Sequence, residues 1–245
     1  MRTARLGLGT TVLFLLLTSL LWAGQPTPAS PGTLPTDTPQ TARDDHPQPD
    51  PSRIHRFDRQ EIRLEDFPAD GYVLDIGGGG EGVIGQLKPR QVVAIDLSAR
   101  ELLGAPAGPL KIVMDATDLK FLDGTFQTAT SFFTLMYMSE ADQARALSEL
   151  HRVLVAGGRL LVWDLVLPAR FDPVKDIAVV PLMIHLPDRQ IETGYGTFFP
   201  KELHDVGYFR HLAARAGFEV VGERATERTF FLELRKPDAK AGVPN

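Results

Sequence analysis

The sequence contains no cysteine. This absence excludes disulfide bonds, thiolate metal sites and a cysteine nucleophile. The six histidines do not occur at a metal-binding spacing such as HExxH, so we expect no metal site. The chain also lacks a basic stripe, and its formal net charge is −5. We therefore expect no nucleic-acid partner.

Long apolar runs are equally scarce, and the single clear one lies at the N-terminus. Residues 6–22 are uncharged and mostly apolar, and two basic residues, Arg2 and Arg5, come before them. This pattern is typical of a signal peptide within residues 1–24. Two alternatives stay open: a retained membrane anchor, with residues 6–22 as the tether, and a start site that lies further downstream.

Large apolar side chains are nearly absent from residues 25–52, where proline and threonine dominate. Such a segment buries too little surface to offset the entropy of ordering it, so we expect a disordered linker. Residues 238–245 are expected to form a disordered tail. The folded domain should therefore span residues 53–237.

Short apolar segments alternate with helical stretches in this domain. Five of them predict strands, at residues 71–76, 91–96, 110–116, 125–138 and 158–167. Near-continuous apolar strands separated by helices indicate an α/β fold with a mostly parallel sheet covered on both faces. Two closing strands, 218–224 and 226–235, should pair as an antiparallel hairpin.

Two helices have clear boundary signals. Ser139 followed by Asp142 resembles a capping box, and Pro200 suits the first position of a second helix that ends at Gly217. Residues 170–200, between the fifth strand and this second helix, are long and apolar for a connection. They predict either a helix on the sheet edge or an insert that recognises an apolar or ring-bearing molecule.

The glycines after the first strand predict a ligand-binding turn. Gly77, Gly79 and Gly82 fit the spacing of a dinucleotide fingerprint, although a turn packed closely on a sheet has the same composition. Asp75, Asp96 and Asp115 each end one of three successive strands. Because the carboxyl ends of parallel strands border the ligand crevice, we expect these three carboxylates to face one cleft.

Four segments, "VLDIGGGGEG", "VVAIDLS", "VMDATDLKFLDGTF" and "LHRVLVAGGRLLVWD", together resemble class I S-adenosylmethionine-dependent methyltransferases. The ubiquinone/menaquinone-biosynthesis group is the most similar in pattern. The resemblance covers about residues 60–236. It implies a Rossmann-like, doubly wound, seven-stranded sheet with an antiparallel C-terminal strand, and S-adenosyl-L-methionine as the cofactor.

The resemblance also implies a set of cofactor contacts. Asp75 and the glycine turn would lie against the methionine part, Asp96 would bind the ribose, and Asp115 the adenine. The full expected set is Asp75, Gly77, Gly78, Gly79, Asp96, Leu97, Asp115, Ala116, Ser131 and Phe133. The family usually has glycine where this chain has Glu81, which leaves the geometry of the turn and the direction of the Glu81 side chain open.

The expected function is methyl transfer to a small, apolar or ring-bearing acceptor. Tyr137, Asp164 and His185 are the candidates for a general base, and none is assigned. A non-catalytic binding or envelope module is the alternative, and an NAD(P)-dependent oxidoreductase is less favoured because no second domain is evident. The leader predicts an exported or anchored protein, whereas the cofactor predicts a cytoplasmic one. The oligomeric state is not predicted.

Overall fold

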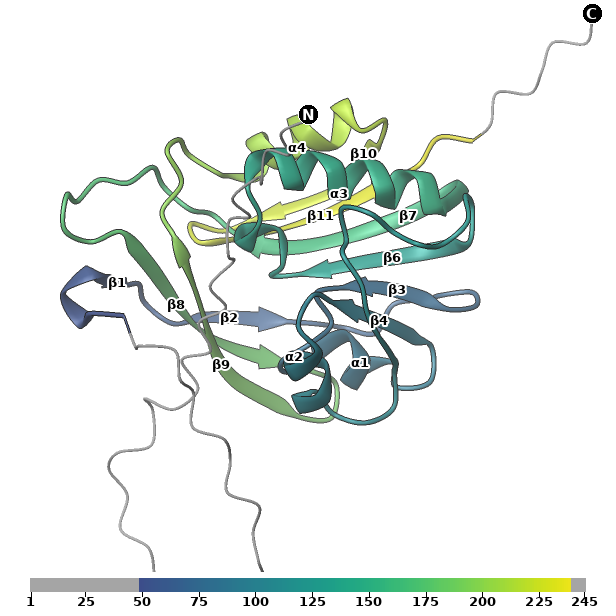
Figure 1. The fold of residues 1–245 in the computed structure, drawn as a ribbon, viewed down its shortest axis with the longest axis horizontal. Helices are drawn as coiled ribbons and strands as arrows, with labels where there is room; N and C mark the ends of the chain where they lie inside the picture. The colour runs from purple at the N-terminus through teal and green to yellow at the C-terminus, as the bar shows by residue number, and fades with distance from the viewer. Residues whose placement is uncertain (1–48, 239–245) are drawn as a thin grey trace, which may run out of the picture.

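Two β-sheets organise the part of the chain that the computed structural model describes, residues 49–238 (Figure 1). The predicted leader, nearly all of the predicted linker and residues 239–245 lie outside the described residues. No helix within residues 49–238 is both long and apolar enough to cross a membrane.

The larger sheet has seven strands in the order β10-β11-β7-β6-β3-β4-β5. Strands from β7 to β5 pair in parallel, while β11 runs antiparallel to both of its neighbours. This arrangement confirms the predicted doubly wound sheet and its closing hairpin. The bounds are β3 (Val73–Ile76), β4 (Val92–Asp96), β5 (Leu110–Val113), β6 (Phe126–Phe132), β7 (Leu154–Leu165), β10 (Glu219–Ala225) and β11 (Thr229–Arg235).

Helices cover both faces of this sheet. Figure 1 shows α3 (Glu140–Val153) and α4 (Val206–Arg215) on one face, with α1 (Val83–Leu87) and α2 (Ala99–Gly104) on the other. The described residues also contain two short 3-10 helices, η1 (Pro51–Arg53) and η2 (Leu135–Tyr137). Every residue of β3 and β4 is buried. That explains why these strands read as continuous apolar runs.

The predicted cap of α3 is confirmed, whereas the predicted start of α4 is wrong. The Ser139 side chain accepts a hydrogen bond from the Asp142 amide, as a capping box requires. The second helix begins after Asp205 instead of at Pro200, because Asp205 provides the side-chain cap. A β-bridge between Leu167 and His204 holds the chain just before this helix.

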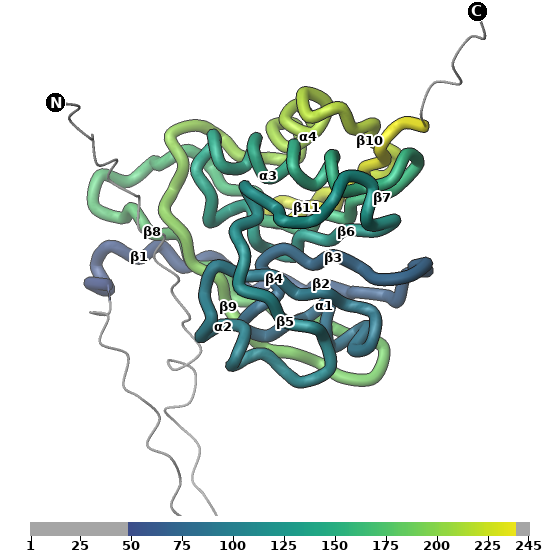
Figure 2. Tube along the Cα trace, turned by 45° about the vertical axis from the view of Figure 1, so that its right-hand side comes forward, coloured from purple at the N-terminus to yellow at the C-terminus, as the bar shows by residue number. Residues whose placement is uncertain are grey.

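The segment after β7 forms a hairpin of strands, so its prediction as a helix on the sheet edge is wrong. Strands β8 (Ile177–His185) and β9 (Gln190–Phe198) pair antiparallel, and β1 (Ile54–Arg56) and β2 (Gln60–Arg63) each pair in parallel with β8. Neither β1 nor β2 was predicted. We call residues 177–198 the inserted hairpin. In Figure 2 it runs on the same side of the large sheet as α1 and α2.

Most apolar side chains of the inserted hairpin belong to the core. Val180, Leu182 and Ile184 are fully buried and pack with residues of α1, α2 and β7. A second apolar cluster lies on the opposite face of the sheet, beneath α3 and α4. The hairpin is therefore a packed layer of the molecule, and it brings only a few side chains to the edge where β3, β4 and β6 end.

Candidate cofactor cleft

Two adjoining cavities lie at the carboxyl ends of β3, β4 and β6. They share Gly77, Asp96, Thr134 and Tyr137. The larger has a volume of about 210 Å³ and is lined further by Ile95, Leu97, Met114, Asp115, Ala116, Thr117, Met138 and Asp142. The smaller is lined further by Gly79, Gly80, Glu81, Glu101, Phe132, Phe133 and Tyr195. Together they form one cleft, which follows the rule that ligands bind at the strand tips of open α/β sheets.

Glycine is required where the chain leaves β3. Gly77 has a φ of +68°, and a Cβ at this position would lie 2.3 Å from the Thr134 Oγ1 atom. The Thr134 hydroxyl donates a hydrogen bond to the Ile76 carbonyl at 3.0 Å, so it cannot easily move away. Both the backbone conformation and the close approach therefore exclude a larger residue. The predicted place of Gly77 and Gly79 in the cleft agrees with this geometry.

Asp75 lies behind the glycine turn, next to Gly78, and its side chain lines neither cavity. Its carboxylate accepts a hydrogen bond from the Thr130 hydroxyl at 2.7 Å. Burial raises the pKa of Asp75 to about 7, although the Thr130 hydrogen bond opposes this shift. Gly78 lies between Asp75 and Ala94, with its amide donating to the Ile95 carbonyl. Both residues shape the turn from behind the surface that a ligand would touch.

Asp96 lies at the centre of the cleft, as predicted, and borders both cavities. One of its carboxylate oxygens accepts a hydrogen bond from the Ser98 amide at 2.8 Å, which fixes the side chain. Burial raises the pKa of Asp96, while hydrogen bonds from backbone amides, including that of Gly79, oppose the shift. A fixed carboxylate at this position can accept hydrogen bonds from vicinal hydroxyl groups.

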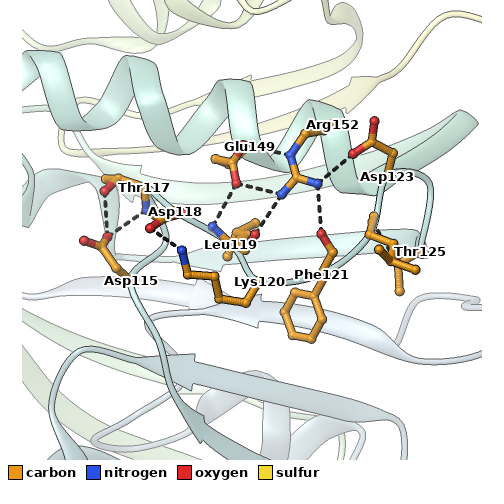
Figure 3. A network of polar contacts seen from close by, with 11 residues as sticks. Asp115, Thr117, Asp118, Leu119, Lys120, Phe121, Asp123, Thr125, Glu149 and Arg152 are labelled. Carbon is orange, nitrogen blue, oxygen red and sulfur yellow. Dashed lines mark hydrogen bonds and ion pairs between the residues drawn. The ribbon is translucent and has the colours of Figure 1, made fainter.

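Asp115 borders the larger cavity together with Leu97 and Ala116, so these three predicted residues come together. One oxygen of Asp115 accepts hydrogen bonds from both the amide and the hydroxyl of Thr117, each at 2.8 Å. Figure 3 shows this turn at one end of a polar network that continues to Glu149 and Arg152 of α3. The helix therefore holds the loop that carries this wall of the cleft.

Ser131 and Phe133, predicted together, occupy different environments. Ser131 is fully buried in β6 and lines neither cavity, and its hydroxyl has no hydrogen-bond partner among the described residues. Phe133 lines the smaller cavity with a φ of +52°, an uncommon conformation for a bulky residue and one that concentrates at functional sites. Its ring lies 5.3 Å from that of Tyr195, centroid to centroid.

The three candidate bases are not brought together. Asp164 is fully buried and accepts a hydrogen bond from the Met136 amide at 3.1 Å, so it anchors η2. His185 lies near the end of β8, 2.5 Å from the Glu61 carboxylate, and lines neither cavity. Tyr137 borders both cavities. Burial raises the pKa of Tyr137, and the nearby Glu81 carboxylate raises it further, which keeps the hydroxyl protonated.

Several cleft residues carried no usable signal in the sequence. Tyr195 reaches the cleft from β9, and its hydroxyl donates to the Glu81 carboxylate at 3.2 Å. Glu101 belongs to α2, and Asp142 was predicted only as a helix cap. A lone tyrosine or glutamate in a helix or strand is uninformative, whereas Thr134 could have been inferred from its position two residues after the end of β6.

The charged side chains that line the cleft are all acidic. Five acidic residues line the two cavities: Glu81, Asp96, Glu101, Asp115 and Asp142. Among residues 49–238, no lysine, arginine or histidine belongs to the lining. Such a surface favours a cationic ligand and opposes a pyrophosphate, which needs amide or cationic donors. The residues present therefore fit a sulfonium nucleoside better than a dinucleotide.

Comparisons with known proteins agree with this geometry. Residues 74–162 match a methyltransferase domain family. The chain is 29% identical over 175 residues to the O-methyltransferase cnsE of Penicillium expansum. The aligned region covers 66% of this chain and 57% of that protein. It is 32% identical over 111 residues to a demethylmenaquinone methyltransferase of Bacteroides fragilis, covering 42% of this chain and 44% of that protein. The chain thus spans about half the length of these relatives.

A solved structure from Methanosarcina mazei, described as an S-adenosylmethionine-dependent methyltransferase, shares the fold. Its TM-score is 0.52 at 18% identity, with 71% of this chain and 95% of that chain covered. The domain match spans β3 to β7, where the glycine turn and Asp96 lie. The sheet order is thus that of a Rossmann-like α/β fold, and residues 74–162 are similar to a methyltransferase domain family.

Proposed function

We propose that this protein transfers a methyl group from S-adenosylmethionine to a small, apolar or ring-bearing acceptor. The acidic cleft carries this proposal, because five carboxylates and, within the described part of the chain, no basic side chain line the cavities at the strand ends. A cationic nucleoside satisfies this charge, whereas the phosphates of a dinucleotide do not. The family match over the same strands supports the same cofactor.

The larger cavity suits the nucleoside part of the cofactor. Leu97 and Ala116 offer apolar contacts to a base, and Asp115 offers a carboxylate beside them. Asp96 stands between this wall and the glycine turn, where it would accept hydrogen bonds from the ribose. The smaller cavity, against the glycine turn, then receives the amino-acid end.

The reaction needs alignment more than acid–base chemistry. When bound, S-adenosylmethionine supplies a sulfonium methyl group that a nucleophile displaces in line, with a neutral thioether as the leaving group. The chain's own residues fix the direction of attack and exclude water. Phe132, Phe133 and Tyr195 provide the apolar wall near the turn. Tyr137 stays protonated, so its hydroxyl serves as a hydrogen-bond donor and not as a base.

The acceptor would pack against this aromatic wall, beside the amino-acid end of the cofactor that the same cavity receives. The apolar residues of the inserted hairpin are mostly committed to the core, with Tyr195 as its contribution to the cavities. The aromatic rings of Phe133 and Tyr195 lie close together and face the cavity from two different layers. Aromatic and apolar surfaces of this kind bury a flat ring or a short apolar chain well.

Substitution of Asp96 tests the cofactor. Asp96→Ala should weaken binding of S-adenosylhomocysteine by about 1–3 kcal/mol, because charge-assisted hydrogen bonds to the ribose are lost. Isothermal titration calorimetry measures this change. Glu192→Gln, which removes an exposed carboxylate on β9, is the matched control and should bind as the unchanged protein does. Equal affinities for all three proteins would contradict the placement of the ribose.

Turnover tests the enzyme. The protein is incubated with S-adenosylmethionine and a panel of phenols, quinols, apolar amines and, for contrast, polar aliphatic alcohols and amines, and formation of S-adenosylhomocysteine is followed. Turnover confined to ring-bearing or apolar acceptors is the expected result. Tight cofactor binding with no turnover across the panel would instead support a non-catalytic binding module. Binding of neither cofactor nor product would reject methyl transfer altogether.

A further inference from the structure

Glu81 projects from the glycine turn toward the inserted hairpin. The Thr193 hydroxyl donates to one of its carboxylate oxygens and the Tyr195 hydroxyl donates to the other. Thr193 and Tyr195 are two residues apart in β9, so their side chains lie on the same face of the strand. Both are buried, with exposed fractions of 2% and 8%. The carboxylate is thus held from two points by an element more than a hundred residues away.

The backbone that carries Glu81 is also fixed. Its carbonyl accepts a hydrogen bond from the Gln86 side chain at 2.7 Å, and the Gly80 amide donates to the Glu101 carbonyl at 3.1 Å. These contacts hold both ends of the turn around Glu81. The side chain is therefore preorganised at the rim of the smaller cavity before any ligand arrives.

The negative charge of Glu81 is not balanced within the cavity. Two hydroxyl groups stabilise a carboxylate, but they carry no charge. Within residues 49–238 Glu81 forms no ion pair, and the smaller cavity is also lined by the carboxylates of Asp96 and Glu101. A partly buried carboxylate in such surroundings gains most from a cationic group of a ligand.

The order of the cavities decides which cationic group this is. With the proposed placement of the nucleoside in the larger cavity and of the ribose at Asp96, the amino-acid end would point into the smaller cavity. We propose that Glu81, held by Thr193 and Tyr195 of the inserted hairpin, binds the α-ammonium group of S-adenosylmethionine. This inference rests on the proposed function. It makes the hairpin part of the cofactor site, with Thr193 and Tyr195 as positioning residues.

Two ligands separate this role from a general effect on the turn. S-adenosylhomocysteine carries the α-ammonium group, whereas 5′-methylthioadenosine has the same nucleoside and lacks the amino acid. Calorimetry with the unchanged protein, Glu81→Gln and Glu192→Gln gives the comparison. Glu81→Gln should weaken S-adenosylhomocysteine binding about tenfold or more and change 5′-methylthioadenosine binding less than about twofold. Glu192→Gln, on the exposed face of the same strand, should change neither affinity.

Thr193→Val provides a second variant that keeps the charge. It removes one donor to Glu81, so it should produce a smaller loss that is again confined to S-adenosylhomocysteine. The role of Glu81 would be overturned if a variant lost the same affinity for both ligands. It would also be overturned if Glu81→Gln and Thr193→Val both bound S-adenosylhomocysteine as tightly as the unchanged protein. Either result would leave the proposed function standing. An unchanged protein that binds neither nucleoside would overturn both.

Discussion

The glycine turn has no room for a side chain at Gly77 or Gly78, for two different reasons. Gly78 has no positive φ, yet a Cβ there would lie 2.7 Å from an Asp75 carboxylate oxygen and 2.8 Å from the Ala94 Cβ. The requirement at this position is close packing and not backbone conformation, unlike Gly77. Glycine therefore serves two distinct physical purposes within two consecutive residues.

Gly78→Ala should lower the free energy of unfolding by about 1–3 kcal/mol, because the added methyl group overpacks the turn against β4. Gly104→Ala is the matched control, since a Cβ there meets nothing within 4 Å. Its effect should be neutral or stabilising by up to about 1 kcal/mol. Urea denaturation followed by circular dichroism measures both. Similar stability of the two variants would contradict the packing argument.

Some site residues could be predicted individually and others could not. Asp96 ends a strand, Leu97 and Asp115 follow strand ends, and the carboxyl edge of a parallel sheet gathers such residues. Ser131 also lies near a strand end but faces the interior. The direction of one side chain depends on the register and packing of β6, which the sequence pattern does not resolve.

At the scale of elements, α3 shows how local signals and long-range contacts combine. Its N-terminus is capped by Ser139, and its C-terminal turn presents Arg152 to the loop between β5 and β6. The cap is a pattern within four residues, so the sequence predicted it. The loop contacts span about thirty residues, and nothing in the pattern around Arg152 indicated them.

Ser139→Ala should destabilise the protein by about 1 kcal/mol, because the Asp142 amide loses its side-chain acceptor. Ser148→Ala is the matched control within the same helix, where Ser148 is exposed. Alanine has the higher helix propensity, so this control should be neutral or slightly stabilising. Thermal and urea unfolding compare the variants. A Ser139→Ala variant as stable as the Ser148→Ala control would show that the cap contributes nothing.

Arg152→Ala should loosen the loop that carries Asp115. The Arg152 guanidinium donates to the Leu119 and Phe121 carbonyls and pairs with Glu149 (Figure 3). Its loss should cost about 1–3 kcal/mol of stability, since partly buried carbonyls lose charge-assisted donors.

S-adenosylhomocysteine binding should also weaken in this variant, which calorimetry detects. Arg145→Ala removes one exposed ion pair of the same helix and serves as the control, with an expected cost below about 1 kcal/mol. If Arg152→Ala retained full affinity for S-adenosylhomocysteine, the loop would not depend on α3 for its position.

At the scale of the whole molecule, burial of carboxylates links stability to pH. Burial raises the pKa of Asp164 from its ordinary value of 3.8 to about 7, although amide donors including that of Met136 oppose the shift. Between these two values the folded protein retains a proton that the unfolded chain has released. The free energy of unfolding contributed by Asp164 therefore falls as pH rises from about 4 to about 7, and is constant above that range.

The unchanged protein should accordingly be less stable toward urea at pH 8 than at pH 5. Asp164→Asn carries no ionisable group, so the decrease between these pH values should be smaller, even though the variant is less stable overall. Asp75 contributes a decrease of the same sign and remains in both proteins. Glu192→Gln should keep the full decrease. Identical pH dependence in Asp164→Asn and the unchanged protein would contradict this linkage.

The sequence by itself determined the strands of the large sheet, the cap of α3, the glycine turn and the place of Asp96. Each depends on residues close together in the chain or on the common edge at which parallel strands end. Only the tertiary structure decided that residues 177–198 form a hairpin across the sheet, and that Tyr195 meets Glu81. These two residues are 114 positions apart, and their contact depends on how two layers pack, which no local pattern encodes.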